Sequence, residues 1–153
     1  MNRVVLLFMA LVLGGCGARF IDERPAVPDL SPPPDLAGAD IQESQVASGS
    51  FEGRHGYSGA GRAALVDLGN GQFELRFGDD FSASPVPGPV VYLSSRASLG
   101  NSINDATDIS LGRLQRNSGA QSYVIPVDPG GRRYAWVYCA PFNVEVAVAA
   151  LAP

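Results

Sequence analysis

The stretch AALVDLGNGQFELRF, residues 63–77, decides the fold class of this chain. Polar and apolar residues alternate without exception over residues 72–77, which is typical of a β-strand with one buried face. A second apolar run precedes this strand, and the sequence Gly69-Asn70-Gly71 lies between the two. Because Asn-Gly tolerates the positive φ angles of a type I′ turn, the stretch predicts an antiparallel hairpin closed by such a turn.

The remainder of residues 46–153 continues the same kind of pattern. Short apolar or alternating runs are separated by turns rich in glycine and proline, and no amphipathic helix or internal repeat is present in the sequence. We therefore predict an all-β domain, either a single antiparallel β-sandwich or a partly closed barrel of about eight short strands. Besides the hairpin, the expected strands are residues 50–54, 90–94, 109–114, 121–125, 134–139 and 144–151.

The last two predicted strands are the most apolar, and they are expected to form the central hairpin of the core. Along residues 144–149, valines alternate with Glu145 and alanines, so the valines are expected on one face and Glu145 on the other. Pro141 lacks an N–H group for a sheet ladder, which predicts that it lies in the bend. Along residues 134–139, Cys139 is expected on the face opposite to the aromatic side chains of Tyr134, Trp136 and Tyr138.

Composition and charge exclude several classes of function. The 153 residues include 15 acidic and 11 basic residues, which gives a net charge of −4, and every basic residue is arginine. The absence of lysine excludes Schiff-base chemistry and a Walker-A phosphate site. A pI near 4.8 argues against nucleic acid as a partner. With two cysteines and one histidine, one chain cannot assemble a structural zinc site, and we expect no metal site.

The N-terminal residues have the features of an export signal. A positive start, Met1-Asn2-Arg3, is followed by an apolar run at 4–13 that is too short to span a membrane. The sequence Leu13-Gly14-Gly15-Cys16 resembles the bacterial lipoprotein signal. This resemblance implies that residues 1–15 are removed and that Cys16 carries a diacylglyceryl group and a palmitate-type acyl chain. The alternative is an ordinary signal peptide with an incidental cysteine nearby.

The resemblance to lipoproteins also implies a location. Gly17 follows Cys16 where an inner-membrane retention signal usually has aspartate, so the expected destination is the bacterial outer membrane, with the protein facing the periplasm. Residues 16–45 are rich in proline and acidic residues and low in large apolar ones, which predicts a linker without a core of its own. We interpret the linker as a plain spacer, with a proline-motif ligand at residues 32–34 as the alternative.

Four segments of the β domain resemble the DM-thirteen domain family, in the order that the family has them. They are SFEGRHGYSG (50–59), Asp80-Phe81 followed by GPVVYLS (88–94), LGRL with GAQSYVIP (111–114 and 119–126), and VYCAPFNV (137–144). The resemblance implies a small all-β module, often found beside DOMON and cytochrome-b-type domains, that takes part in electron transfer through its single cysteine. Tyr138 and Val90 depart from the residues usual in the family at their positions.

Cys139 is the central candidate for chemistry in this domain. If Cys16 carries lipid, Cys139 is the remaining thiol, and unpaired thiols are unusual in an oxidising compartment. One interpretation is a redox-active thiol. The other is a small buried residue that fills a place in the core, as free cysteines often do.

His55 and a few neighbouring residues are candidates for a supporting role. His55 lies in a glycine-rich loop, where it could accept a proton near Cys139, ligate a haem or metal, or bond to backbone. Haem held by a His/Met pair is excluded in the processed chain, because Met1 and Met9 lie in the signal, but single ligation by His55 or Cys139 remains open. The other support candidates are Asp80, Phe81, Trp136 and Tyr138.

Two stretches with many side-chain oxygens, Asp79-Asp80 and residues 101–108, lack the spacing of a calcium loop and are interpreted as solvated turns. No nucleophile–base or paired-carboxylate motif is present in the sequence, so we do not expect an enzyme. The leading hypothesis is a membrane-anchored, non-enzymatic electron-transfer accessory module that uses Cys139 and a periplasmic redox partner protein supplied in trans. The alternative is a ligand-binding or envelope protein-interaction domain in which Cys139 is only structural.

Overall fold

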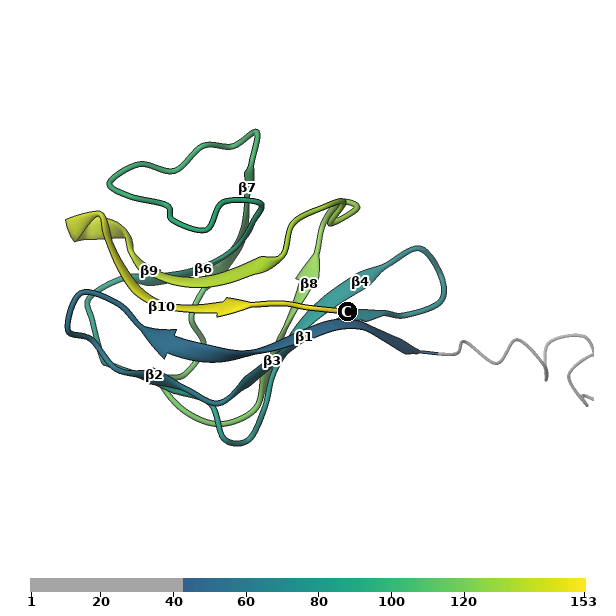
Figure 1. The fold of residues 1–153 in the computed structure, drawn as a ribbon, viewed down its shortest axis with the longest axis horizontal. Coiled ribbons are helices and arrows are strands. Elements are labelled where there is room, and N and C mark those ends of the chain that lie inside the picture. The colour runs from purple at the N-terminus through teal and green to yellow at the C-terminus, as the bar shows by residue number, and fades with distance from the viewer. Residues whose placement is uncertain (1–42) are drawn as a thin grey trace, which may run out of the picture. The chain divides into compact units, whose positions relative to one another are not determined.

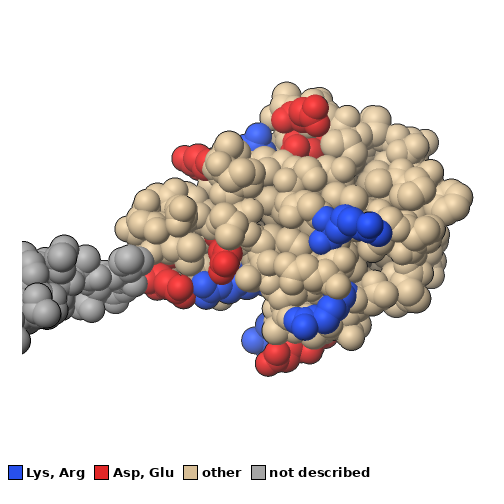
Figure 2. All heavy atoms as spheres, turned by 180° about the vertical axis from the view of Figure 1, so that it is seen from behind, with Lys and Arg blue, Asp and Glu red and all other residues tan. Residues whose placement is uncertain are grey.

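The computed structural model describes residues 43–153. On the face drawn in Figure 2, acidic and basic side chains are scattered among the other residues and form no large patch of one sign. The predicted signal peptide 1–15, the predicted lipidation site Cys16 and nearly all of the predicted linker 16–45 lie outside the described residues. Within the described part, no helix is long and apolar enough to cross a membrane.

The described residues form strands joined by loops and one short 3-10 turn, η2 (Ala140–Phe142). Seven strands coincide closely with the predicted ones, whereas the first is longer and two strands of two residues each were not predicted. The strands are β1 (Ser44–Gly53), β2 (Gly59–Ala60), β3 (Arg62–Asp67), β4 (Phe73–Phe77), β5 (Ser82–Ala83), β6 (Pro89–Ser94), β7 (Asp108–Arg113), β8 (Gln121–Ile125), β9 (Tyr134–Cys139) and β10 (Val144–Ala150).

Eight of these strands form one antiparallel sheet in the order β7-β6-β9-β10-β1-β3-β4-β8, and β2 pairs with β5 in a small second sheet. The large sheet curls around its own inner face, so that it is nearly closed into a barrel (Figure 1). No ladder of hydrogen bonds joins the edge strands β7 and β8 within the described residues. The prediction of an all-β domain is therefore confirmed, with a partly closed barrel as its architecture. The predicted central hairpin, β9 with β10, occupies the middle of this sheet.

The hairpin at residues 63–77 is present, but its turn differs from the prediction. Strands β3 and β4 pair from Ala63↔Phe77 to Asp67↔Phe73. A type I′ turn needs positive φ at two adjacent residues, whereas here Gly69 and Gly71 have φ of 76° and 79° and Asn70 does not. The Asn70 side chain instead accepts a hydrogen bond from the Gln72 N–H at 3.0 Å, so the type I′ prediction is wrong.

Strand β1 begins earlier than the composition of the chain indicates. Ser44 and Gln45, which we expected to be linker, pair with Asp67 and Val66 of β3. The sheet extends this far because β3 offers unpaired backbone groups here, and a register shift after Gln45 brings Ala47 into the core.

The inner face of the sheet encloses the main hydrophobic core. Its centre is a group of aromatic rings with neighbouring centroids 4.7 to 5.4 Å apart, contributed by Phe51, Phe77, Phe81 and Tyr123. Ala135, Val137 and Cys139 of β9 face this core, as the alternation along that strand predicted.

A second, smaller cluster packs on the outer face of β9 and its neighbours. It contains Trp136, Tyr138, Val148 and Leu99, and Leu99 belongs to the long loop 95–107 between β6 and β7. This loop stands above the sheet in Figure 1 and covers the two aromatic residues. The prediction that Trp136 and Tyr138 share the face opposite to Cys139 is confirmed.

The predicted alternation along β10 is wrong beyond its first residues. Glu145 pairs with Tyr138 and Ala147 pairs with Val137, so Val146 is one extra residue in the ladder. This bulge puts Glu145 and Val148 on the same outer face and turns Ala147 towards the main core. Pro141 lies in the η2 turn between β9 and β10, as predicted.

Candidate functional site

Cys139 is the last residue of β9, and its side chain is buried at the edge of the main core. It pairs with Pro89 of β6 on one side and with Val144 of β10 on the other. The residue is 1% exposed, and among the described residues it is the free cysteine. Its Sγ donates a hydrogen bond to the carbonyl oxygen of Pro87 at 3.1 Å. The thiol is therefore buried and partnered, with a single backbone carbonyl as acceptor.

The segment over Cys139 is residues 85–89, which we call the proline cover. Pro85 and Pro87 are exposed, and the prolines at 85, 87 and 89 have no N–H to donate. Besides the pairing of Pro89 with Cys139 and the bond from the thiol to Pro87, the cover accepts two backbone hydrogen bonds: Ala140 N–H donates to Gly88 O at 3.4 Å, and Leu114 N–H donates to Pro89 O at 2.9 Å. The Val86 side chain packs against the main core. Outside the β6 ladder the cover thus makes few backbone hydrogen bonds.

Gly88 allows the proline cover to lie close to the η2 turn. Its φ is +57°, and a Cβ at this position would lie 3.0 Å from two ring atoms of Pro141. A side chain here would be strained by the left-handed backbone and by this contact.

His55 is not brought to Cys139. Its backbone is left-handed with φ of 51°, and its side chain is 59% exposed. The Nε2 atom lies 3.3 Å from Oε2 of Glu145, a carboxylate on the outer face of the sheet, whereas Cys139 faces the main core. The imidazole therefore interacts with a buried carboxylate instead of the thiol.

Glu145 fixes the loop 95–107 to the sheet. Its Oε1 accepts hydrogen bonds from Leu99 N at 2.6 Å, Ser98 Oγ at 2.8 Å and Gly100 N at 2.9 Å, and the residue is 5% exposed. Burial by itself raises the pKa of Glu145, but the hydrogen bonds from these groups and from His55 outweigh it, so the net pKa is lowered. The carboxylate is held ionised and anchors three consecutive residues of the loop.

Asp108 lies at the other end of the same loop, and its burial shows that the interpretation of residues 101–108 as a solvated turn is wrong for this residue. Its fully buried carboxylate accepts bonds from Ser94 Oγ at 2.6 Å and Asn104 N at 2.7 Å, and from Thr107 and both Nε and Nη2 of Arg96. Burial raises the pKa of Asp108, but these donors lower it to about 2. Its oxygens are thus used by donors from the chain, and among residues 43–153 no group of three acidic, His or Cys residues could hold a metal ion.

The aromatic residues named as support candidates are packed and hydrogen-bonded to the loop. Trp136 Nε1 donates to Arg96 O at 3.2 Å, and the Tyr138 hydroxyl donates to Gly100 O at 3.3 Å. Tyr92 meets Tyr138 edge to face with centroids 6.1 Å apart. Burial raises the pKa of Tyr138. These rings hold the loop 95–107 on the sheet.

Asp80 and Phe81 are placed apart from the thiol. Asp80 accepts a hydrogen bond from the Arg62 N–H at 3.0 Å, and Phe81 is buried between the rings of Phe51 and Phe77. Both contribute to the turn and core near β3.

The residues that the sequence offered as single haem ligands do not fit that cofactor. The Cys139 sulfur is buried and bonded to Pro87, and the His55 Nε2 is bonded to Glu145. Neither residue lines either of two surface pockets in the described part of the chain, one near Arg54 and one near Arg76. A haem would need one of these atoms at the wall of an apolar slot.

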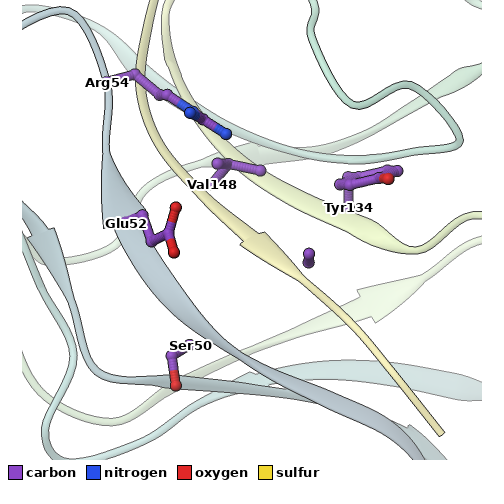
Figure 3. Close-up of a pocket in the computed structure, with 6 residues that line it drawn as sticks. Ser50, Glu52, Arg54, Tyr134 and Val148 are labelled. Atoms are coloured by element: carbon purple, nitrogen blue, oxygen red, sulfur yellow. The ribbon is translucent and has the colours of Figure 1, made fainter.

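Sequence reasoning missed two features of the outer face. One is the anchoring by Glu145, and the other is a pocket of about 230 Å³ on the outer face of β1, β10 and β9, near Arg54 (Figure 3). Glu145 had a recognisable signal, because it is a charged residue within an otherwise apolar strand. The pocket is lined by Ser50, Glu52, Arg54, Tyr134, Val148 and Ala150.

Comparison with known proteins assigns the family. No curated protein and no solved structure matches the chain. The family model described as electron transfer DM13 matches residues 50–151, which is more than half of the chain and contains nearly the whole sheet. On this match, the chain belongs to the electron transfer DM13 domain family.

Proposed function

We propose that this protein is a lipid-anchored, periplasm-facing lipoprotein of the bacterial outer membrane that serves as an electron-transfer accessory module, with Cys139 as its redox group. Membership of the electron transfer DM13 family supports the electron-transfer role. The sequence Leu13-Gly14-Gly15-Cys16 after an apolar run supports the lipid anchor. The module does not turn over a substrate of its own but exchanges electrons with a partner protein.

The observation that carries the proposal is the position of the Cys139 thiol under the proline cover. A cysteine at the centre of the barrel could be reached only by unfolding the sheet. Cys139 instead lies at the end of β9, and one backbone carbonyl in an exposed segment is its hydrogen-bond acceptor. Segments with few backbone hydrogen bonds open locally at a lower free energy than the core strands do. Opening of residues 85–88, the part of the cover outside β6, would therefore expose the thiol while the sheet stays folded.

The chemistry that fits a single thiol is exchange with a disulfide of the partner protein. After the cover opens, the Cys139 thiol loses its proton and the thiolate attacks one sulfur of the partner disulfide. A Cys139–partner S–S bond forms, the partner S–S bond breaks, and the departing partner thiolate takes up a proton. The Cys139 sulfur is oxidised and one partner sulfur is reduced, so atoms and electrons balance.

A packing role for Cys139 is the competing interpretation, and the burial of its side chain in the main core favours it. In that case the domain is a ligand-binding or envelope-interaction module. The two roles differ in one measurable property, which is whether the thiol reacts in the folded protein.

The full chain, purified in detergent and incubated with glutathione disulfide at neutral pH, is expected to form a glutathione adduct at Cys139. Mass spectrometry with peptide mapping locates the adduct, and Cys139→Ala is expected to remove it. Circular dichroism recorded in parallel is expected to show that the sheet stays folded. An adduct that forms only in urea would assign Cys139 to packing.

A further inference from the structure

The pocket near Arg54 lies on the outer face of the sheet, apart from Cys139. Ser50 and Glu52 of β1 form one wall, Val148 and Ala150 of β10 form the floor, and Tyr134 of β9 lies opposite. Figure 3 shows the Arg54 side chain reaching from the end of β1 across β10. The pocket is thus formed by three adjacent strands of the large sheet.

The Arg54 guanidinium has unused donors. Its backbone is fixed, because Arg54 N donates to Val146 O at 2.9 Å and Arg54 O accepts from Tyr57 N at 2.8 Å. The ion pairs among residues 43–153 use other side chains. The Nε atom is shielded from solvent and has no hydrogen-bond partner in the described part of the chain. A buried donor without a partner is uncommon, and guanidinium groups bind planar carboxylates through paired hydrogen bonds.

Trp136 supports the guanidinium from below. The Arg54 Cζ lies 6.0 Å from the centroid of the Trp136 ring, which is at the limit of a cation–π contact. This contact holds the charged group over the sheet without consuming any of its N–H donors.

The remaining lining indicates what kind of ligand fits. Glu52 is exposed, lies two residues before Arg54 and takes part in none of the ion pairs of the described residues. Two residues along a strand span about 7 Å, a distance that these two long side chains can bridge from opposite sides of a small head group. Val148 and Ala150 offer an apolar surface beside these charges. An acidic side chain, a basic side chain and an apolar floor together fit a zwitterionic ligand that also has an apolar side chain.

We propose that this pocket binds a free aliphatic α-amino acid. The ligand carboxylate accepts hydrogen bonds from the guanidinium N–H groups of Arg54 that face the pocket. Its ammonium group lies towards Glu52 and Ser50, and its side chain lies on Val148 and Ala150. The volume of about 230 Å³ lies below the range typical of drug-sized ligands and suits a ligand of this size. Glu52 disfavours a multiply charged anion such as phosphate, because its carboxylate would lie close to that charge.

The test uses the single tryptophan of the chain as a reporter, because Trp136 lies under Arg54. The full chain in detergent is titrated with L-leucine, 4-methylpentanoate, L-leucinamide and inorganic phosphate while Trp136 emission is recorded. L-Leucine is expected to give a saturable change. 4-Methylpentanoate is expected to bind several-fold more weakly and L-leucinamide at least tenfold more weakly, since each lacks one charged group. Phosphate is expected not to saturate.

Variants separate the pocket from general effects. Arg54→Gln is expected to weaken the binding of L-leucine at least tenfold. Glu52→Gln is expected to weaken the binding of L-leucine but not that of 4-methylpentanoate. Arg113→Gln is the matched control, because Arg113 is an exposed arginine on β7. It is expected to change the affinity for neither L-leucine nor 4-methylpentanoate. Calorimetric unfolding confirms that each variant is folded. Phosphate binding as tight as that of L-leucine, the absence of saturation by L-leucine, or unchanged affinity in Arg54→Gln would overturn the proposal.

Discussion

Replacing Asp108 with asparagine is expected to lower the free energy of unfolding by about 3 kcal/mol at pH 7. The Asp108 carboxylate is fully buried and accepts bonds from Ser94, Arg96, Asn104 and Thr107. An amide in its place would turn an NH₂ group towards these donors and leave the Arg96 charge without its partner. Urea unfolding followed by circular dichroism measures the difference.

The stability difference between the wild type and Asp108→Asn is expected to depend on pH. The pKa of Asp108 is lowered from 3.8 to about 2 in the folded protein, so folding favours the ionised carboxylate. Its stabilisation is complete above about pH 5 and is lost as the pH falls through 4 towards 2, a change of about 2 kcal/mol. The stabilities of the wild type and Asp108→Asn are therefore expected to converge at low pH.

Asp105→Asn is the matched control, because Asp105 is exposed in the same loop, and its effect is expected to stay within about 0.5 kcal/mol. A difference between Asp108→Asn and wild type that stays constant from pH 7 to pH 2 would contradict the electrostatic account of this network.

Replacing Glu145 with leucine is expected to destabilise the protein by about 3 kcal/mol, because three donors of the loop 95–107 lose their acceptor. Glu145→Gln retains an oxygen at the position of Oε1 and is expected to cost less than half as much. Release of the loop would also uncover Trp136, which Leu99 packs against. The emission of this single tryptophan is therefore expected to shift to longer wavelength in Glu145→Leu.

Glu52→Leu provides the comparison, since Glu52 is exposed and anchors no part of this loop. We expect it to change stability by no more than about 0.5 kcal/mol and to leave the loop in place. If Glu145→Leu behaved like Glu52→Leu in both stability and Trp136 emission, Glu145 would not be the anchor of the loop.

The strands could be predicted from the sequence because their signals are local. Alternation along β4 indicates which of its side chains face the core, and glycine or proline lies beside many strand ends. The bulge at Val146 could not be predicted in this way, because the run VEVAVAA in β10 has apolar residues on both faces. The core would stay apolar with or without the bulge. The position of the bulge is favoured by the hydrogen bonds that Glu145 makes to the distant loop 95–107.

The candidate site was predictable only in part, for a similar reason. The sequence identified Cys139 and the proline-rich turn separately, but the packing of that turn over the thiol depends on the pairing of β6 with β9. The contact between His55 and Glu145 joins residues 90 positions apart and has no local signal. The unpaired state of Arg54 likewise depends on which strands become its neighbours.

The central claim is that the Cys139 thiol can be reached from the folded state by opening of the proline cover. The most direct measurement is the rate at which Cys139 reacts with iodoacetamide in the full chain as urea is raised below the unfolding transition. We predict a rate that depends on urea far less steeply than global unfolding does. Gly88→Ala, which strains the cover at a left-handed residue, is expected to raise this rate about tenfold. A rate that follows global unfolding at every urea concentration, in both proteins, would show that Cys139 reacts only when the sheet unfolds and would contradict the account.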